Sequence, residues 1–282
     1  MRALTYLARR FVAGEEMSDA VEAVRRLNGN GILASLDVLG EAVTDRNEAE
    51  GAAHDYLRLL DEIACQGIAG NVSIKLSQMG LEIDTEFCFS QMHAILEKAR
   101  QQENFVRIDM ESSALTQSTL DVYYRLYRDH PNVGIVLQSY LYRSEKDARD
   151  LAALHAPVRV CKGAYKEPQS IAFKNMDDIR RSFRTMVEIL LRGGSKVGIA
   201  THDDRLIDWA IEWTGEEKIP RDRFEFQMLY GLRRKRAREL AKNGFQVRTY
   251  VPFGSHWLPY FMRRLRERKE NVFFVLKGLV AD

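Results

Sequence analysis

The chain has 282 residues, of which 45% are hydrophobic and 29% are charged, a composition that is ordinary for a globular protein with a buried core. Its net charge of +2 gives no electrostatic reason to expect a nucleic-acid partner. Its apolar runs are shorter than the roughly 18 residues that span a bilayer, so we expect no transmembrane segment. The N-terminus lacks the apolar core of a secretory signal, which favours a cytoplasmic protein with reduced cysteines.

A helical lead-in over residues 1–28 is predicted to precede eight short, β-rich apolar runs. Stretches with helical periodicity and many charges separate the runs. Several of these stretches end at a residue typical of a helix stop, among them Gly67, Gly193 and Asn243. The runs cover residues 31–40, 71–80, 105–111, 132–140, 157–165, 196–203, 224–231 and 246–254.

Alternation of strand and helix, repeated eight times, predicts parallel strands joined by helical crossovers. An open doubly wound sheet usually has fewer strands and a glycine-rich first turn, and no GxGxxG follows the first run. A closed (β/α)8 barrel of the TIM type needs about 250 residues, which this chain supplies. No linker divides the chain. We therefore expect one α/β domain over residues 1–282, with a final helix (residues 256–269) over the carboxyl ends of the strands.

In such a barrel the active site lies where the strands end. Ionisable or hydrogen-bonding side chains occur at nearly every predicted strand end. Each of them alone is more often a loop ion pair or a helix cap than a catalyst, but their convergence on one rim predicts a polar cleft. These residues are Asp37, Glu41, Lys75, Asp109, Glu111, Gln138, Arg159, Lys162, His202, Asp203, Gln227 and Tyr250.

Two lysines leave the class of reaction open at this stage. Lys75 and Lys162 adjoin apolar runs, where burial costs a lysine its charge unless a carboxylate or an anionic ligand is near. Asp109, on the neighbouring strand, is the expected partner of Lys75. A lysine at a strand end can also form a Schiff base, so an aldolase fits this pattern, and so does a non-catalytic binding barrel. Only one histidine lies near a strand end, so we expect no metal site there.

The final predicted helix carries a possible anion site. Helical spacing places Tyr260, Arg263, Arg264 and Glu267 along one face. Two guanidinium groups one turn from a tyrosine form a fork that suits a carboxylate. A solvated basic helix would show the same spacing, so spacing alone leaves both interpretations open.

Two sequence motifs resemble those of one known family. Residues 158–168 (VRVCKGAYKEP) resemble the fifth-strand motif of proline dehydrogenases, and residues 260–268 (YFMRRLRER) resemble that family's final-helix motif. The resemblance runs from residue 31 to the C-terminus, with further matching segments in the family's order. These segments are LDVLGE, SIKLSQ, IDME, ATHD, FEFQMLYG and YVPFG.

The resemblance implies a flavoenzyme with non-covalent FAD that oxidises L-proline to Δ1-pyrroline-5-carboxylate by hydride transfer to flavin N5. Lys75, Arg263 and Arg264 would bind the proline carboxylate, Glu41 would form a gating ion pair with Arg263, and Glu267 would orient an arginine. The residues implied around the pyrrolidine ring are Ala164, Leu229, Tyr250 and Tyr260. Those implied in catalysis are Lys75, Asp109 and Tyr250. Those implied at the flavin are Asp109, Gln138, Arg159, Lys162, Gly163, Ala164, His202 and Gln227.

The resemblance also implies partners. Electrons would pass to a membrane quinone, which requires a peripheral encounter at the inner membrane surface. The product would suit a pyrroline-5-carboxylate dehydrogenase as a partner enzyme. Because no DNA-binding or aldehyde-dehydrogenase module is evident, we expect the monofunctional bacterial type.

Overall fold

A computed structural model describes residues 10–40 and 42–267 of the chain, with side chains described up to residue 262. Eight parallel strands form a closed barrel in which each strand pairs with the next and β8 pairs with β1. The predicted (β/α)8 barrel is confirmed, and every strand lies within one residue of its predicted run. The strands are β1 (Leu33–Val38), β2 (Gly70–Lys75), β3 (Val106–Asp109), β4 (Val133–Gln138), β5 (Val158–Cys161), β6 (Val197–Ala200), β7 (Phe224–Leu229) and β8 (Val247–Phe253).

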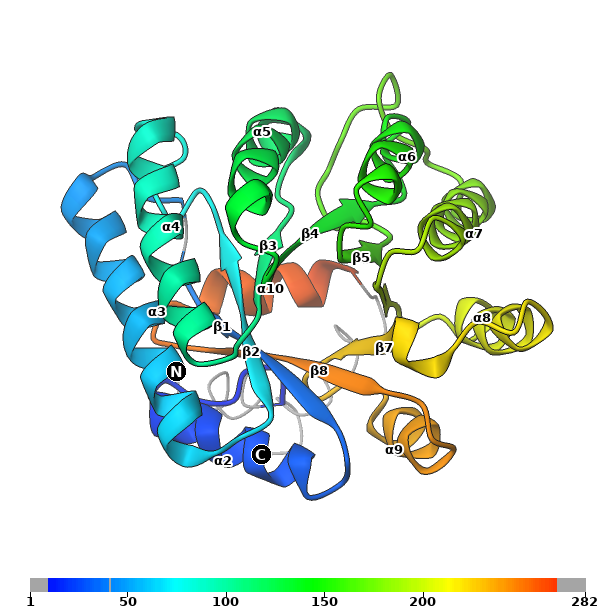
Figure 1. The fold of residues 1–282 in the computed structure, drawn as a ribbon, viewed down its shortest axis with the longest axis horizontal. Helices are drawn as coiled ribbons and strands as arrows, with labels where there is room; N and C mark the ends of the chain where they lie inside the picture. The colour runs from blue at the N-terminus through cyan, green and yellow to red at the C-terminus, as the bar shows by residue number, and fades with distance from the viewer. Residues whose placement is uncertain (1–9, 41, 268–282) are drawn as a thin grey trace, which may run out of the picture.

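Helices surround the outside of the barrel (Figure 1). Helix α2 (Met17–Asn28) precedes β1, and α10 (Trp257–Glu267) follows β8, which agrees with the predicted lead-in and final helix. A single 3-10 turn, η1 (Arg221–Arg223), precedes β7. The crossover helices are α3 (Arg46–Gln66), α4 (Thr85–Gln101), α5 (Ser113–Asp129), α6 (Ser144–Ala153), α7 (Met176–Arg192), α8 (Asp204–Glu216) and α9 (Arg234–Lys242).

Local sequence signals set the limits of these helices. The side chain of Asp45 accepts hydrogen bonds from two backbone N–H groups in the first turn of α3, which would otherwise lack partners. Gly67 ends α3 with a φ of 58°, a left-handed conformation that favours glycine. Gly193 and Asn243 end α7 and α9, so all three predicted helix stops are confirmed.

The apolar core lies between the strands and the helices, whereas the inside of the barrel carries charge. Arg248 pairs with Glu225 at 2.7 Å, and Arg107 donates to the carbonyl oxygens of Ile135 and Pro157 at 3.0 and 2.8 Å. Burial lowers the pKa of Arg107 to about 9. These contacts lie near the amino ends of the strands. Ion pairs and hydrogen bonds therefore fill the inside of the barrel below the carboxyl-end site.

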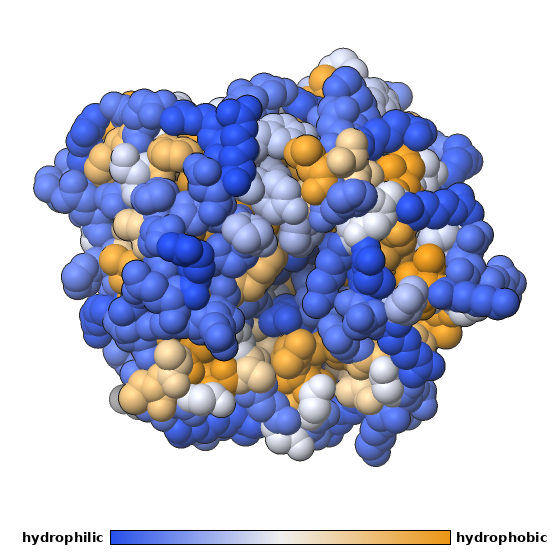
Figure 2. All heavy atoms as spheres, viewed as in Figure 1, coloured by the Kyte–Doolittle hydropathy of each residue, from blue (hydrophilic) through white to orange (hydrophobic). Residues whose placement is uncertain are grey.

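The outer surface is mostly hydrophilic on the face shown in Figure 2, where apolar residues are scattered among polar ones. Among the helices of the described ranges, none is long and apolar enough to cross a membrane. None of the three cysteines, all of which are among the described residues, forms a disulfide.

Candidate active site

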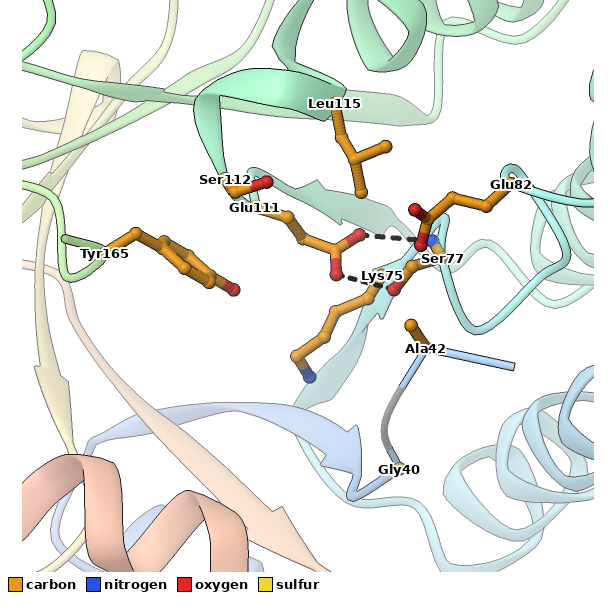
Figure 3. A pocket seen from close by; sticks show the side chains of 9 residues that line it. All are labelled: Gly40, Ala42, Lys75, Ser77, Glu82, Glu111, Ser112, Leu115 and Tyr165. Carbon is orange, nitrogen blue, oxygen red and sulfur yellow. Dashed lines mark hydrogen bonds between the residues drawn. The ribbon is translucent and has the colours of Figure 1, made fainter. Parts of the chain in front are cut away.

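A cavity of about 210 Å³ opens beyond the carboxyl ends of β1, β2 and β3 (Figure 3). It is smaller than the roughly 300–1,000 Å³ of pockets that hold drug-sized ligands, so it suits a small metabolite. Of the polar residues predicted at strand ends, Lys75 and Glu111 line it. The lining residues are Gly40, Ala42, Lys75, Ser77, Glu82, Glu111, Ser112, Leu115 and Tyr165.

Among the described residues that line this cavity, Lys75 is the cation, and its partner is Asp37 on β1. The Lys75 Nζ atom lies 2.7 Å from Oδ1 of Asp37, whose side chain is completely buried. Burial lowers the pKa of Lys75, but attraction to Asp37 and Asp109 outweighs burial and raises the pKa above its ordinary value. Lys75 therefore keeps its charge although only 13% of its side chain is exposed.

The predicted direct pairing of Lys75 with Asp109 is wrong. The two residues are register partners on β2 and β3, so the strand order that suggested the pair is correct. However, Asp109 accepts hydrogen bonds from three other groups: Ser73 Oγ at 2.7 Å, Arg159 Nη1 at 2.6 Å and the Tyr250 hydroxyl at 2.7 Å. With the Asp109 carboxylate occupied, Lys75 turns to the carboxylate on its other side.

Asp109, Arg159 and Tyr250 form a buried network that joins three separate strands. Burial, and then the negative charge of Asp109, raise the pKa of Tyr250 well above its ordinary value, so the phenol stays protonated and donates. Arg159 also donates to Gln227 Oε1 at 2.5 Å and stacks over the Tyr250 ring at 5.4 Å. Three residues predicted at different strand ends are thus brought into direct contact, and Gln227 joins them through Arg159.

Lys162 lies at the end of β5 and is held by Asp203. The Lys162 Nζ atom lies 2.5 Å from Oδ2 of Asp203, which also accepts from Arg180 at 2.8 Å. His202, next to Asp203, accepts a 2.9 Å hydrogen bond at Nε2 from the backbone N–H of Leu229. That contact connects the end of β6 to the end of β7 and fixes the imidazole plane.

Gly163 follows β5 in a conformation that only glycine adopts readily. Its φ is +104°, and a Cβ atom there would lie 2.3 Å from the Tyr140 ring. The adjacent Ala164 is exposed. The Gln138 side chain, buried at the end of β4, donates to the Glu111 carbonyl oxygen at 2.8 Å. The loop after β5 therefore approaches the end of β4 closely.

Glu111 and Ser77 are cavity residues whose contact the sequence did not predict. Glu111 accepts from the backbone N–H of Ser77 at 3.1 Å and from its hydroxyl at 2.5 Å (Figure 3). Burial raises the pKa of Glu111 despite these hydrogen bonds. Tyr165 directs its hydroxyl toward the same cavity (Figure 3). Ser77 and Tyr165 both lie inside the matched motifs, which was the only available signal for them.

The final helix packs on the end of β1. Tyr260 and Phe261 are buried in a cluster with Phe11, Val12 and Leu39. None of the residues predicted around the proline ring is in the described lining of the cavity: Ala164, Leu229, Tyr250 and Tyr260. Leu229 is the register partner of Tyr250 at the ends of β7 and β8. Four predicted residues are outside the described residues or side chains: Glu41, Arg263, Arg264 and Glu267.

The sequence matches one family over most of its length. The family described as proline dehydrogenase matches residues 20–277. Proline dehydrogenase 1 of Bacillus subtilis (strain 168) is 40% identical, over 97% of this chain and 90% of that protein. Proline dehydrogenase of Deinococcus radiodurans is 38% identical over the same shares of the two chains.

The fold is also similar to solved structures. Proline utilization A from Bdellovibrio bacteriovorus, inactivated by N-propargylglycine, matches with a TM-score of 0.87 over 93% of this chain. The identity is 22%, and this chain spans about a third (32%) of that larger protein. This likeness supports the barrel fold and carries no further argument.

Proposed function

The chain belongs to the proline dehydrogenase family, and from this premise we propose that it binds FAD non-covalently and oxidises L-proline to Δ1-pyrroline-5-carboxylate. The observation that carries the proposal is the charged Lys75 at the cavity wall, held by the buried carboxylate of Asp37. An ammonium fixed at the edge of a small cavity suits the carboxylate of an amino acid.

The substrate half of the proposed site combines this lysine with the final helix. We propose that Arg263 and Arg264 bind the proline carboxylate together with Lys75, and that Glu41 and Glu267 gate and orient these arginines. Ala164, Leu229, Tyr250 and Tyr260 would surround the pyrrolidine ring. In support, Leu229 and Tyr250 are register partners at neighbouring strand ends, and α10 is anchored on the end of β1.

The flavin half would occupy the ends of β3 to β7, and the chemistry of the residues there fits FAD. Cationic and amide donors stand at these ends, and positive groups near the isoalloxazine stabilise the charge that reduction places on it. The close approach of Gly163 to Tyr140 leaves backbone, without a side chain, beside this region. The residues proposed to contact the flavin are Asp109, Gln138, Arg159, Lys162, Gly163, Ala164, His202 and Gln227.

FAD, when bound, would supply at N5 a two-electron acceptor for a hydride from the ring CH2 carbon beside the proline nitrogen. The part of the protein is to hold that carbon in place and to exclude water. Lys75 and the two arginines fix the carboxylate, and the aromatic side chains fix the ring. Asp109 holds Arg159 and Tyr250 in a single arrangement through two short hydrogen bonds. Proline enters with a neutral amine, whose lone pair forms the C=N bond as the hydride leaves. The resulting iminium then loses its N–H proton to solvent on release, which gives the neutral imine of Δ1-pyrroline-5-carboxylate.

We further propose that the electrons pass to a membrane quinone while the cytoplasmic protein is at the inner membrane surface. A pyrroline-5-carboxylate dehydrogenase is the proposed partner for the product. The family resemblance supports both proposals.

A Schiff-base aldolase that uses Lys75, one of the two candidate lysines, is disfavoured by the state of this residue. A nucleophilic lysine needs a lowered pKa so that its amine is neutral. The pKa of Lys75 is raised, and its nitrogen donates to Asp37 at 2.7 Å. Borohydride treatment with a carbonyl substrate should therefore leave Lys75 unmodified.

Arg264→Met tests the proposed carboxylate site. Loss of one charge-assisted contact, worth roughly 1.5–3 kcal/mol, should raise the KM for L-proline about tenfold or more and leave FAD content unchanged. Arg266→Met is the matched control on the same helix and should change neither value. An unchanged KM in Arg264→Met would show that the carboxylate binds elsewhere.

A further inference from the structure

We propose that His93, Glu97 and His130 bind a divalent transition-metal ion, of which Zn²⁺ is the best match, between α4 and the end of α5. One nitrogen of each imidazole and one carboxylate oxygen all lie within 4.8 Å of one another. None of the three residues belongs to the proposed active site. The proposed metal site takes no part in flavin chemistry and would link α4 to the end of α5.

The backbone brings the three side chains together from two elements. His93 and Glu97 stand four residues apart on α4, a spacing that places both on the same helix face one turn apart. His130 is the residue that ends α5. The His93 Nδ1 and His130 Nε2 atoms lie 2.9 Å apart, and His130 Nδ1 lies 3.5 Å from Oε1 of Glu97.

The buried histidine gives an independent reason to expect a ligand. Only 1% of His130 is exposed, and its Nδ1 atom has no hydrogen-bond partner among the described residues. A buried polar atom without such a partner loses its hydrogen bonds to water and forms none in their place, which destabilises the fold. A metal ion bonded to Nδ1 would compensate for that loss.

Neighbouring side chains already orient the other two ligands. The His93 ring stacks on Phe89, with centroids 6.3 Å apart, and meets the His130 ring edge-on at 4.8 Å. Arg100 donates to Oε2 of Glu97 at 2.7 Å, which leaves Oε1 directed toward His130. Contacts of this kind, to groups that bind a metal, raise metal affinity by fixing ligand orientation.

The ligand set selects a class of metal. Two imidazole nitrogens and one carboxylate oxygen suit Zn²⁺, with water as a fourth ligand, and do not suit Mg²⁺ or Ca²⁺, which prefer oxygen. Bonds of about 2.1 Å in a tetrahedron place ligand atoms roughly 3.4 Å apart. The ligand atoms must therefore move closer together to bind a metal. His93 is exposed and Glu97 is half-buried, so both side chains can make the small rotations that this requires.

The proposed site is at the opposite end of the barrel from the active site. The chain runs from His130 directly to the amino end of β4 at Val133, whereas the cavity lies beyond the carboxyl ends. A metal at His130 would therefore stabilise the packing of α4 on α5 without contacting substrate or flavin. Sequence spacing gave no sign of it, because the two histidines are 37 positions apart in the chain.

The test is calorimetric titration of ZnCl2 into the full-length, FAD-loaded protein after treatment with EDTA. We expect one equivalent of Zn²⁺ to bind and, at a hundredfold excess over Kd, the Tm to rise by roughly 5 °C. His93→Gln and Glu97→Gln should each weaken Zn²⁺ binding at least tenfold. His54→Gln removes an exposed histidine of α3 and should bind Zn²⁺ like the unaltered protein.

Two results would overturn the proposal. One is the absence of stoichiometric heat and of any Tm shift with ZnCl2. The other is equal Zn²⁺ affinity in His93→Gln and His54→Gln, which would place binding elsewhere. Because His93 is exposed, its replacement should not prevent folding, and the Tm of the metal-free variant verifies this.

Discussion

Lys75 donates a 2.7 Å hydrogen bond to Asp37 on β1, although its register partner on β3 is Asp109. The two buried carboxylates therefore have separate tasks. Asp37 holds the cation that faces the cavity, whereas Asp109 holds Arg159 and Tyr250. We propose that Asp37 orders the lysine of the substrate half, whereas Asp109 joins the two halves of the pocket by holding Arg159 of the flavin half and Tyr250 of the substrate half.

Asp37→Asn tests the first of these tasks. Removal of the buried negative charge leaves the Lys75 ammonium without its closest partner, and breaking a buried ion pair costs about 3 kcal/mol or more. We expect the unfolding free energy at pH 7 to fall by about 3 kcal/mol, as measured by urea denaturation.

The matched control is Asp61→Asn, which breaks the exposed ion pair between Asp61 and Lys98. Exposed pairs contribute little to stability, so its urea midpoint should stay close to that of the unaltered protein. Equal effects of the two substitutions would contradict the assignment of Asp37 as the buried partner of Lys75.

Tyr250→Phe tests the Asp109 network. The substitution removes the hydroxyl that donates to Asp109 at 2.7 Å but keeps the ring. Asp109 retains Ser73 and Arg159, so the unfolding free energy should fall by about 1.5 kcal/mol, the value of one hydrogen bond to a charged group. Tyr142→Phe removes a more exposed hydroxyl that donates to the Gln169 carbonyl oxygen, and it should cost less than about 0.5 kcal/mol.

Gly163→Ala tests the close approach of the β5 loop to Tyr140. The φ of +104° and the 2.3 Å contact force the backbone or the Tyr140 ring to move. We expect FAD affinity, measured by fluorescence titration, to fall at least tenfold. Gly51→Ala, in α3, meets no atom within 4 Å and should leave FAD affinity unchanged while stabilising the helix by about 0.5–1 kcal/mol. Unchanged FAD affinity in Gly163→Ala would show that this loop does not contact the flavin.

Asp203→Asn gives a prediction with a pH dependence. Burial raises the pKa of Asp203, but hydrogen bonds from Lys162 and Arg180 outweigh it and bring the pKa to about 2. A lowered folded-state pKa stabilises the fold above the ordinary value of 3.8, and this contribution is lost as the pH falls toward 2.

The variant should therefore be less stable at pH 7 by about 1 kcal/mol, allowing for solvent screening, and the difference should shrink between pH 4 and pH 2. Asparagine can cap α8 as Asp203 does, so the measured difference in stability does not include the loss of a helix cap. Urea denaturation at several pH values measures the difference, and a constant difference across that range would contradict the assignment.

Periodicity alone predicted the barrel because the sequence signals of each strand–helix unit lie within that unit. Caps such as Asp45 and stops such as Gly67 act within a few residues of the helix that they limit. Closure of the barrel then follows from the number of strands, and with it the common rim of Lys75, Asp109 and Tyr250.

Side-chain pairing could not be predicted in the same way. Lys75 has a carboxylate on each neighbouring strand, and the choice between them depends on Arg159, which reaches Asp109 from β5, two strands away. In the sequence, the buried charges Arg107 and Glu225 look like the ordinary polar residues of strands in which apolar and polar side chains alternate. Which groups pair inside a closed barrel depends on its three-dimensional register, which periodicity does not contain.

The most direct test of the central claim is the visible spectrum of the FAD-loaded protein when L-proline is added without oxygen. The proposed function predicts that the oxidised-flavin band bleaches, and that Lys75→Met needs at least tenfold more L-proline for the same bleaching. A protein that binds FAD but keeps an unchanged spectrum with L-proline, or one that cannot bind FAD, would contradict it.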